Sequence, residues 1–481
     1  MEQANSFKPS LGLFDATMIV AGSMIGSGIF IVSSDITRNV GSAGWLIAVW
    51  VITGFMTISA AVSYGELSSM YPKAGGQYVY LKEAYNPMMG FLYGWSFFAV
   101  IQTATIAAVA VAFSRYTSYL IPAVGENNIL FSIGSADNPF TISAAQVLGI
   151  ALIVLLTYTN TKGIKGGKLI QTTFTSAKLI SLFGLIIFGF LLVQENFWDA
   201  NWATGMDARS FKGDTGAPAE SGWESISGTV LIGAIAASMV GSIFSSDAWN
   251  NVTFIAGEVR NPQRNIGLSL FLGTLIVTII YVSANLMYLY VLPLDGIAFA
   301  QNDRVAISAA QKIFAEAGAI IIAVMIMIST FGCNNGLILA GARVYYTMAK
   351  DKLFFRKTSE LNKNAVPEYA LWIQCLVASL LCLSGSYGNL LDMIAFVVVL
   401  FYALTIAGIF ILRKKRPDLP RPYKAFGYPV LPIIYIVLAI VFCVFLIKLK
   451  PLYAGIGLAI VLLGVPLYYL AASKNKTNVA D

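Results

Sequence analysis

Histidine is absent from this 481-residue chain, and charged residues make up only 11% of it. The imidazole side chain that most often serves as acid, base or metal ligand near neutral pH is therefore missing. A soluble domain carries about 25% charged residues, whereas this chain is 57% hydrophobic with a mean hydropathy of +0.73. The composition excludes an ordinary soluble protein and indicates a polytopic membrane protein.

Cysteine is also scarce. The four cysteines, Cys333, Cys375, Cys382 and Cys443, lie in or beside apolar runs, which suggests packing rather than disulfides or metal sites. The sequence contains no zinc motif and no convincing pair of nucleophile and base. We therefore expect a protein that is not an enzyme and that binds no cofactor or metal.

Long hydrophobic runs are abundant, and we predict twelve membrane helices. They cover residues 12–32, 44–67, 88–119, 144–160, 169–193, 228–256, 268–292, 319–348, 367–385, 388–412, 428–447 and 451–472. A crossing needs about 20 mostly apolar residues, and the gaps between these runs leave no room for a soluble domain. The prediction is an all-α polytopic membrane protein with a single transmembrane domain, residues 1–481, whose longest hydrophilic loops are 120–143, 194–227 and 293–318.

Lysine and arginine are distributed unequally between alternate loops. Only eight of the 31 lie in the second set of loops, namely Arg38, Arg115, Arg209, Lys212, Arg304, Lys312, Lys448 and Lys450. The positive-inside rule then places both termini in the cytoplasm. We expect the plasma membrane, or the inner membrane of a Gram-negative cell, and no nucleic-acid partner, because the basic residues are split among many short loops.

Residues 22–30 interrupt the first predicted helix with three glycines and two serines. They are Gly22, Ser23, Gly26, Ser27 and Gly28. Glycine costs about 1 kcal/mol relative to alanine inside a helix, and unwound backbone is tolerated in a membrane only inside protein or beside a polar cavity. The alternative interpretation is a close helix contact of the small-xxx-small type.

Residues 244–251 interrupt the sixth predicted helix with a polar run. The run is Phe244, Ser245, Ser246, Asp247, Ala248, Trp249, Asn250 and Asn251. Serine, aspartate and asparagine side chains compete for backbone hydrogen bonds and loosen helices. A charged Asp247 side chain costs free energy inside a membrane unless it is protonated, paired with a cation or exposed to water. A helix that simply ends near Ser245 is the alternative, but apolar sequence resumes at Val252.

Interrupted first and sixth helices are what an inverted repeat of five helices predicts. The repeats would cover residues 12–193 and 228–412, and residues 428–472 would add two helices. Each break exposes N–H groups on one half-helix, which suit a carboxylate, and bare carbonyls on the other, which suit an ammonium. A solute that carries both groups side by side is an α-amino acid.

Four regions in order resemble the amino acid–polyamine–organocation superfamily, and in particular its L-type amino acid transporter branch. They are residues 22–30, 64–67 with 72–78, 244–251 with 258–265, and 421–424. The resemblance implies a secondary-active permease that moves neutral L-amino acids by alternating access, either as a sodium-independent exchanger or coupled to protons. Sodium coupling, cationic amino acid or polyamine substrates, and a transporter-like sensor are the alternatives.

The resemblance also implies roles for particular residues. The substrate-binding set is Ser23, Met24, Gly26, Ser27, Gly28, Phe244, Asp247 and Ala248. The N–H groups of Ser27 and Gly28 would hold the carboxylate, and the carbonyls of Met24, Phe244 and Asp247 would take the amino group. The Phe244 ring would close over the substrate. The chain departs from the family in having Ala248 where glycine is common and Gly257 where a second glutamate is common.

Lys178 is the one charge in an otherwise uncharged part of the fifth predicted helix. By resemblance, its ammonium stands where a sodium ion sits in sodium-coupled relatives; the alternative is a side chain that reaches the membrane interface. Ser329 and Thr330 offer hydroxyl ligands for a cation if sodium is used. Loop 120–143 lacks cysteine, so we expect no disulfide-linked heavy chain, as in a prokaryotic-type member.

Overall fold

A computed structural model describes residues 9–134, 140–213, 222–384 and 387–477. In this part of the chain, ten helices are long and apolar enough to cross a membrane, and two shorter apolar helices, Leu13–Met24 and Glu368–Leu383, accompany them. Each of the twelve predicted segments coincides with helical structure, so the prediction of an all-helical polytopic fold is confirmed. The division into two inverted repeats stays a prediction.

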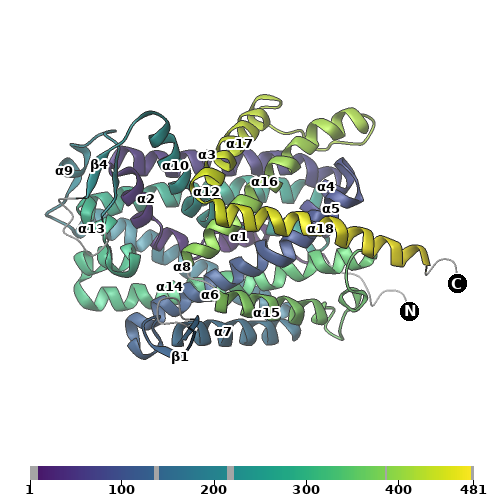
Figure 1. Cartoon of the computed structure of the whole chain (residues 1–481), viewed down its shortest axis with the longest axis horizontal. Coiled ribbons are helices and arrows are strands. Elements are labelled where there is room, and N and C mark those ends of the chain that lie inside the picture. Colours follow the sequence, from purple (N-terminus) through teal and green to yellow (C-terminus); the bar gives the residue numbers. More distant parts are fainter. Residues whose placement is uncertain (1–8, 135–139, 214–221, 385–386, 478–481) are drawn as a thin grey trace.

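The long helices form one bundle (Figure 1). Their bounds are α1 Leu13–Met24, α3 Ala43–Met70, α5 Pro87–Ser96, α6 Gln102–Leu120, α7 Ala144–Thr161, α8 Ile164–Leu192, α10 Gly228–Ser245, α12 Pro262–Val291, α14 Val305–Lys350, α15 Glu368–Ser384, α16 Tyr387–Lys415, α17 Val430–Leu449 and α18 Pro451–Thr477. Helix α3 packs along α12, and α14 packs against both α6 and α8. These contacts place α1 between α12, α8 and α14.

The connections gather at two ends of the bundle (Figure 1). One end, called the strand end here, carries helices α9 (Trp198–Trp202) and α13 (Leu294–Ala298) and two antiparallel hairpins. The hairpins are β1 (Ile129–Ile133) with β2 (Phe140–Ser143), and β3 (Arg209–Phe211) with β4 (Trp223–Ser225). Helix α4 (Gln77–Ala84) lies at the opposite end. The three long hydrophilic loops thus share one end, as alternating crossings require, although their hairpins were not predicted.

The first membrane segment is longer than predicted. After α1 the chain is non-helical from Ile25 to Ser27, forms a 3-10 turn, η2 (Gly28–Phe30), and continues as α2 (Ser33–Val40). The predicted end at residue 32 was wrong, because α2 is rich in polar residues and a hydropathy scan stops where they begin. Gly41, with a φ of +55°, ends α2 in the left-handed conformation that glycine readily adopts.

A π-helical turn, Phe97–Ile101, connects α5 to α6 and was not predicted either. Such turns are rare and are found frequently at functional sites. Helix α14 also departs from regular geometry, at Ala315, where φ is +58°. The first fourteen residues of α14, 305–318, lie in what the sequence predicted to be loop 293–318.

Candidate functional site

Side chains from two other helices bind the backbone carbonyls at the end of α1. The Lys178 ammonium, on α8, donates to the carbonyl of Gly22 at 2.5 Å and to that of Ile25 at 2.7 Å. The Ser329 hydroxyl, on α14, lies 3.4 Å from the same Ile25 carbonyl. Since the last carbonyls of a helix lack intrahelical donors, these contacts explain how the break is tolerated inside the membrane.

Lys178 is only 1% exposed. Its side chain therefore points into the protein, and the alternative of a lysine that reaches the interface is wrong. Thr330 behaves differently from its neighbour Ser329, because its hydroxyl donates to the carbonyls of Ile326 and Met327 in its own helix. Of the two hydroxyls predicted as cation ligands, only that of Ser329 contacts the first break.

Tyr281 on α12 joins the two breaks. Its hydroxyl lies 3.0 Å from the carbonyl of Met24 and 2.9 Å from that of Ser245, at the C-terminal ends of α1 and α10. A hydroxyl has one proton to donate, so these two carbonyls share a single donor. The sequence analysis missed Tyr281 because a tyrosine in an apolar run carries no local signal of this contact.

Gly28 brings the breaks into direct contact. A Cβ built at this position would lie 2.6 Å from the Cβ and 2.9 Å from the Cα of Ser245, so a side chain here would collide with the backbone of α10. Gly26 faces α14 instead, where a Cβ would lie 3.3 Å from the Cys333 sulfur. The Cys333 thiol in turn lies 3.2 Å from the carbonyl of Ser23. The first-helix residues of the predicted substrate set are therefore close to one another and tightly enclosed, with Ser27 fully buried among them.

The second break follows the end of α10. Residues 246–250 are not helical, and the chain then forms the short helix α11 (Asn251–Phe254) and a 3-10 turn, Ala256–Glu258. Asp247 is 8% exposed and accepts a hydrogen bond of 2.5 Å from the Tyr402 hydroxyl on α16. The Tyr402 side chain is buried as well, so its hydroxyl serves the second break rather than the membrane interface.

Ala248 has a φ of +63°. This left-handed conformation costs a residue with a side chain about 1–3 kcal/mol, whereas glycine adopts it freely. The sequence has alanine at position 248, where glycine is common in the family it resembles. The backbone conformation at this position favours glycine as well.

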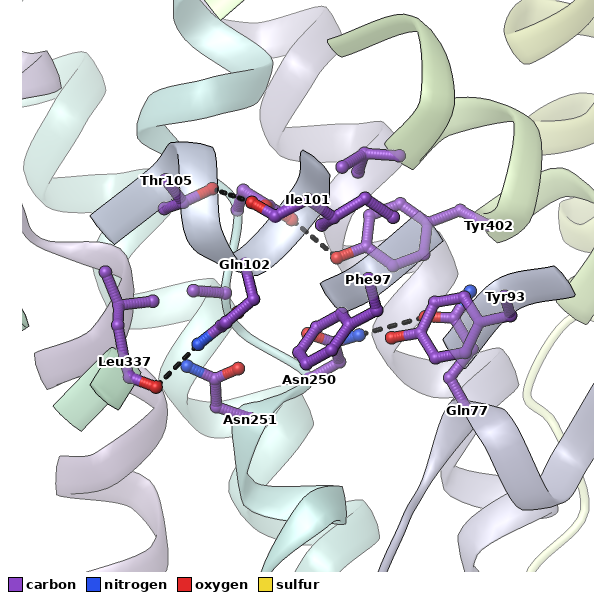
Figure 2. A pocket seen from close by; sticks show the side chains of 13 residues that line it. Gln77, Tyr93, Phe97, Ile101, Gln102, Thr105, Asn250, Asn251, Leu337 and Tyr402 are labelled. Carbon is purple, nitrogen blue, oxygen red and sulfur yellow. Dashed lines mark hydrogen bonds between the residues drawn. The ribbon is translucent and has the colours of Figure 1, made fainter. Parts of the chain in front are cut away.

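A narrow cavity, with a volume of about 10 Å³, lies beside the second break (Figure 2). Its lining residues are Gln77, Tyr93, Phe97, Ile101, Gln102, Thr105, Asp247, Ala248, Asn250, Asn251, Leu337, Val398 and Tyr402. That volume has room for about one water molecule and is far below the roughly 300–1,000 Å³ typical of ligand sites. Aromatic walls and several amides surround it, so its lining offers both polar and apolar contacts, but the side chains must move before a larger solute fits.

Two amide contacts order this cavity (Figure 2). The side chain of Asn250 donates to Gln77 Oε1 at 3.1 Å, and that of Gln102 donates to the Leu337 carbonyl at 2.6 Å. None of these residues was predicted as a site residue. A glutamine in the middle of an apolar helix, as at position 102, is a signal that could have been used.

Of the eight predicted substrate-binding residues, Asp247 and Ala248 line this cavity, and the others are not among its lining residues. Phe244 is buried at the end of α10, and its carbonyl accepts the N–H of Asp247 at 3.2 Å. The two breaks are thus adjacent, as predicted from their place in the chain, but the cavity extends from the second break toward α5, α6, α14 and α16 rather than between the breaks.

The end opposite the strands is closed below the breaks. The carbonyl of Glu258 accepts the N–H groups of Ser10 and Leu11 at 2.9 and 3.0 Å, and the buried Glu258 side chain lies 3.3 Å from Arg343 Nε. One carboxylate, rather than a pair, makes this contact. That arrangement accords with Gly257 standing where a second glutamate was expected.

The family and the relatives of this chain agree with the geometry. A family model described as amino acid permease matches residues 11–472. The human large neutral amino acids transporter small subunit 2 is 30% identical over 469 residues, which cover 97% of this chain and 81% of the relative. The mouse Asc-type amino acid transporter 1 is 28% identical over 466 residues, with the same coverage of each chain. The human b(0,+)-type amino acid transporter 1 is 26% identical over 446 residues, covering 92% and 83%. This chain belongs to the amino acid permease family.

Proposed function

We propose that this chain is a secondary-active transporter that moves neutral L-amino acids across the plasma membrane by alternating access. Membership of the amino acid permease family supports amino acid transport. The observation that carries the proposal is the pair of adjacent helix breaks, at residues 25–27 and 246–250. Helix ends exposed inside a membrane protein offer N–H groups to a carboxylate and carbonyls to an ammonium.

Lys178 supports sodium-independent transport. Its ammonium already binds two carbonyls of the first break, which are the ligands that a sodium ion would need there. A sodium ion about 4 Å from a fixed ammonium would be repelled by roughly 4 kcal/mol at an effective dielectric of 20. The Ser329 hydroxyl lies at the same carbonyl, so it adds a ligand but no separate place for the ion.

Lys178 also bears on coupling. A lysine that stays charged through the transport cycle brings no proton across, and obligatory exchange of internal for external amino acid then follows. A lysine that releases its proton in one state would give proton symport instead. Exchange is our proposal, and the pH dependence of uptake distinguishes the two.

The charge distribution supports an orientation with both termini in the cytoplasm and the strand end outside. Few basic residues of the chain lie in the loops that form the strand end. Loop 120–143 contains no cysteine, which supports a transporter that works without a disulfide-linked heavy chain.

Asp247 supports a second candidate, the transport of cationic amino acids. Its side chain lines the cavity of Figure 2, and in the described part of the chain it forms no ion pair with lysine or arginine. A carboxylate buried in a membrane protein calls for a cationic partner or a proton. The side-chain cation of a substrate would supply the partner.

The test is uptake of labelled amino acids by proteoliposomes that contain the purified protein. We expect uptake of neutral amino acids. Unlabelled amino acid inside the vesicles should stimulate this uptake, and the uptake should be equal when choline replaces sodium. Flux that vanishes in choline would overturn the sodium-independent mechanism, and stimulation only by an inward proton gradient would replace exchange by symport. Preference for lysine or arginine would favour the second candidate.

Two further outcomes would reject amino acid transport itself. A decarboxylated amine that competes as well as its parent amino acid would show that the carboxylate is not recognised. Binding without flux would indicate a sensor on a transporter fold.

A further inference from the structure

A second and larger cavity, of about 340 Å³, lies at the strand end. Ile31, Val32 and Gly241 form part of its wall, so it reaches the segment that directly follows the first break and the helix that leads into the second. The opposite end is closed by Glu258 and Arg343. The cavity therefore borders both broken segments on the strand-end side of their breaks.

Charges of both signs line this cavity in equal number. They are Asp35, Arg38, Arg115, Asp303, Asp392 and Lys450. A cleft with one sign of charge concentrates ions of the opposite sign, whereas this balanced set gives no such preference. It matches a solute that itself carries one positive and one negative group.

Two of these six residues have hydrogen-bonding capacity to spare. Arg38 and Asp303 form an ion pair of 2.8 Å. Asp35 accepts one hydrogen bond, from Asn39 Nδ2 at 3.2 Å, and its other carboxylate oxygen lies 3.7 Å from Arg38, beyond hydrogen-bond distance. The Asp35 side chain is 57% exposed. Lys450 is 45% exposed and lies 3.1 Å from Asp392. Its ammonium has three donors, which leaves capacity beyond that contact.

Asp35 and Lys450 come from different parts of the wall. Asp35 is on α2, the continuation of the broken first helix, and Lys450 follows the last residue of α17. Asp35 interacts electrostatically with Lys450 as well as with Arg38. An acceptor and a donor with free capacity therefore line the same cavity within electrostatic range of each other.

We propose that this cavity is an outer docking site for the zwitterionic backbone of an amino acid on its way to the breaks. The substrate ammonium pairs with Asp35 and the substrate carboxylate pairs with Lys450. The inference rests on the proposed function and adds to it the class of solute admitted from the strand end. A solute that lacks either charge loses one of the two contacts.

The test compares the KM for the strand end with the KM for the opposite end. Uptake into vesicles whose strand end faces outward gives the external KM, and exchange driven by internal substrate gives the internal KM. We expect Asp35→Asn and Lys450→Gln each to raise the external KM roughly two- to fivefold, the effect of one solvent-exposed ion pair, and to leave the internal KM unchanged. Lys448→Gln is the matched control, because it removes the same charge from the same end of α17 at a position that does not line the cavity.

A carboxyl-free probe adds an independent measurement. The methyl ester of the same amino acid keeps the ammonium, so its competition at the outer face should weaken in Asp35→Asn but not in Lys450→Gln. The docking site would be overturned if Asp35→Asn and Lys450→Gln changed the external KM no more than the Lys448→Gln control does. It would also be overturned if either variant raised the external and internal KM equally. Absence of amino acid uptake by the unmodified protein would instead refute the proposed function.

Discussion

Replacing Lys178 by methionine tests how the first break is held together. Methionine keeps an unbranched side chain of similar length but removes the ammonium. The carbonyls of Gly22 and Ile25 then lose donors that lie at 2.5 and 2.7 Å. The Ser329 hydroxyl remains 3.4 Å from the carbonyl of Ile25.

The size of the effect follows from these contacts. A buried carbonyl left without a donor costs about 1–3 kcal/mol. The Gly22 carbonyl loses the Lys178 donor, and the Ile25 carbonyl keeps only the long contact to Ser329, so the two losses together cost about 2–5 kcal/mol. Removing a buried charge returns part of this cost, because the ammonium is itself expensive to keep out of water. We therefore expect the Lys178→Met substitution to lower the free energy of unfolding by about 2–4 kcal/mol.

The effect on transport follows from the same loss of support. A barrier that is higher by only about 1.4 kcal/mol slows a step roughly tenfold, so we expect exchange to fall by at least about that factor. Thermal unfolding in detergent and exchange in proteoliposomes measure the two quantities on one preparation. Ser329→Ala is the control. Because the hydrogen bond from the Ser329 hydroxyl to the Ile25 carbonyl is long, this substitution should lower the free energy of unfolding by less than about 1 kcal/mol. A Lys178→Met protein as stable and as active as the unmodified chain would refute this account of the break.

Three further substitutions test other contacts. Tyr281→Phe removes the donor shared by the two helix ends and should lower the free energy of unfolding by about 1 kcal/mol and slow exchange; unaltered exchange would contradict its bridging role. Ala248→Gly relieves a φ of +63° and should stabilise the protein by about 1 kcal/mol, seen as a higher Tm; a lower Tm would argue against strain. Glu66→Gln weakens the contacts of 3.0 and 2.7 Å to Arg413 and should cost about 1–3 kcal/mol because Glu66 is fully buried and Arg413 partly exposed; an unchanged Tm would show that the pair contributes nothing.

The helical bundle and its two breaks could be predicted because their signals are local. A run of about 20 apolar residues is enough to indicate a crossing, and a cluster of glycines or polar residues inside such a run marks an interruption. Lys178 could be singled out for the same reason, since a lone ammonium in an apolar helix must either find acceptors or reach water. Its carbonyl partners in the first break fit that argument.

The contacts that complete the site could not be predicted, because they join residues far apart in the chain. Tyr281 and Tyr402 look like ordinary aromatic residues of apolar helices, and only the packing of α12 and α16 places their hydroxyls at the breaks. Glu66 lies near the C-terminal end of α3, yet its side chain is fully buried beside Arg413. Helix α2 was missed because its residues are mostly polar. A search for apolar runs therefore ends before this continuation of the first segment.

Two of the three carbonyls predicted for the substrate ammonium already have donors, which constrains how a substrate binds. The Phe244 carbonyl accepts the N–H of Asp247 at 3.2 Å, and the Met24 carbonyl lies 3.0 Å from the Tyr281 hydroxyl. Because a carbonyl oxygen has two lone pairs, an ammonium at either of them shares the oxygen with an existing donor or replaces that donor.

At Met24 the replacement needs no net loss of hydrogen bonds. When a substrate ammonium takes the Met24 carbonyl, the single proton of Tyr281 is free to bond the Ser245 carbonyl, 2.9 Å away. The donor then moves from the end of α1 to the end of α10, while the number of satisfied carbonyls is preserved. Arrival of the substrate is thereby linked to the contact that holds the two breaks together, and such a link is what alternating access requires of a binding site.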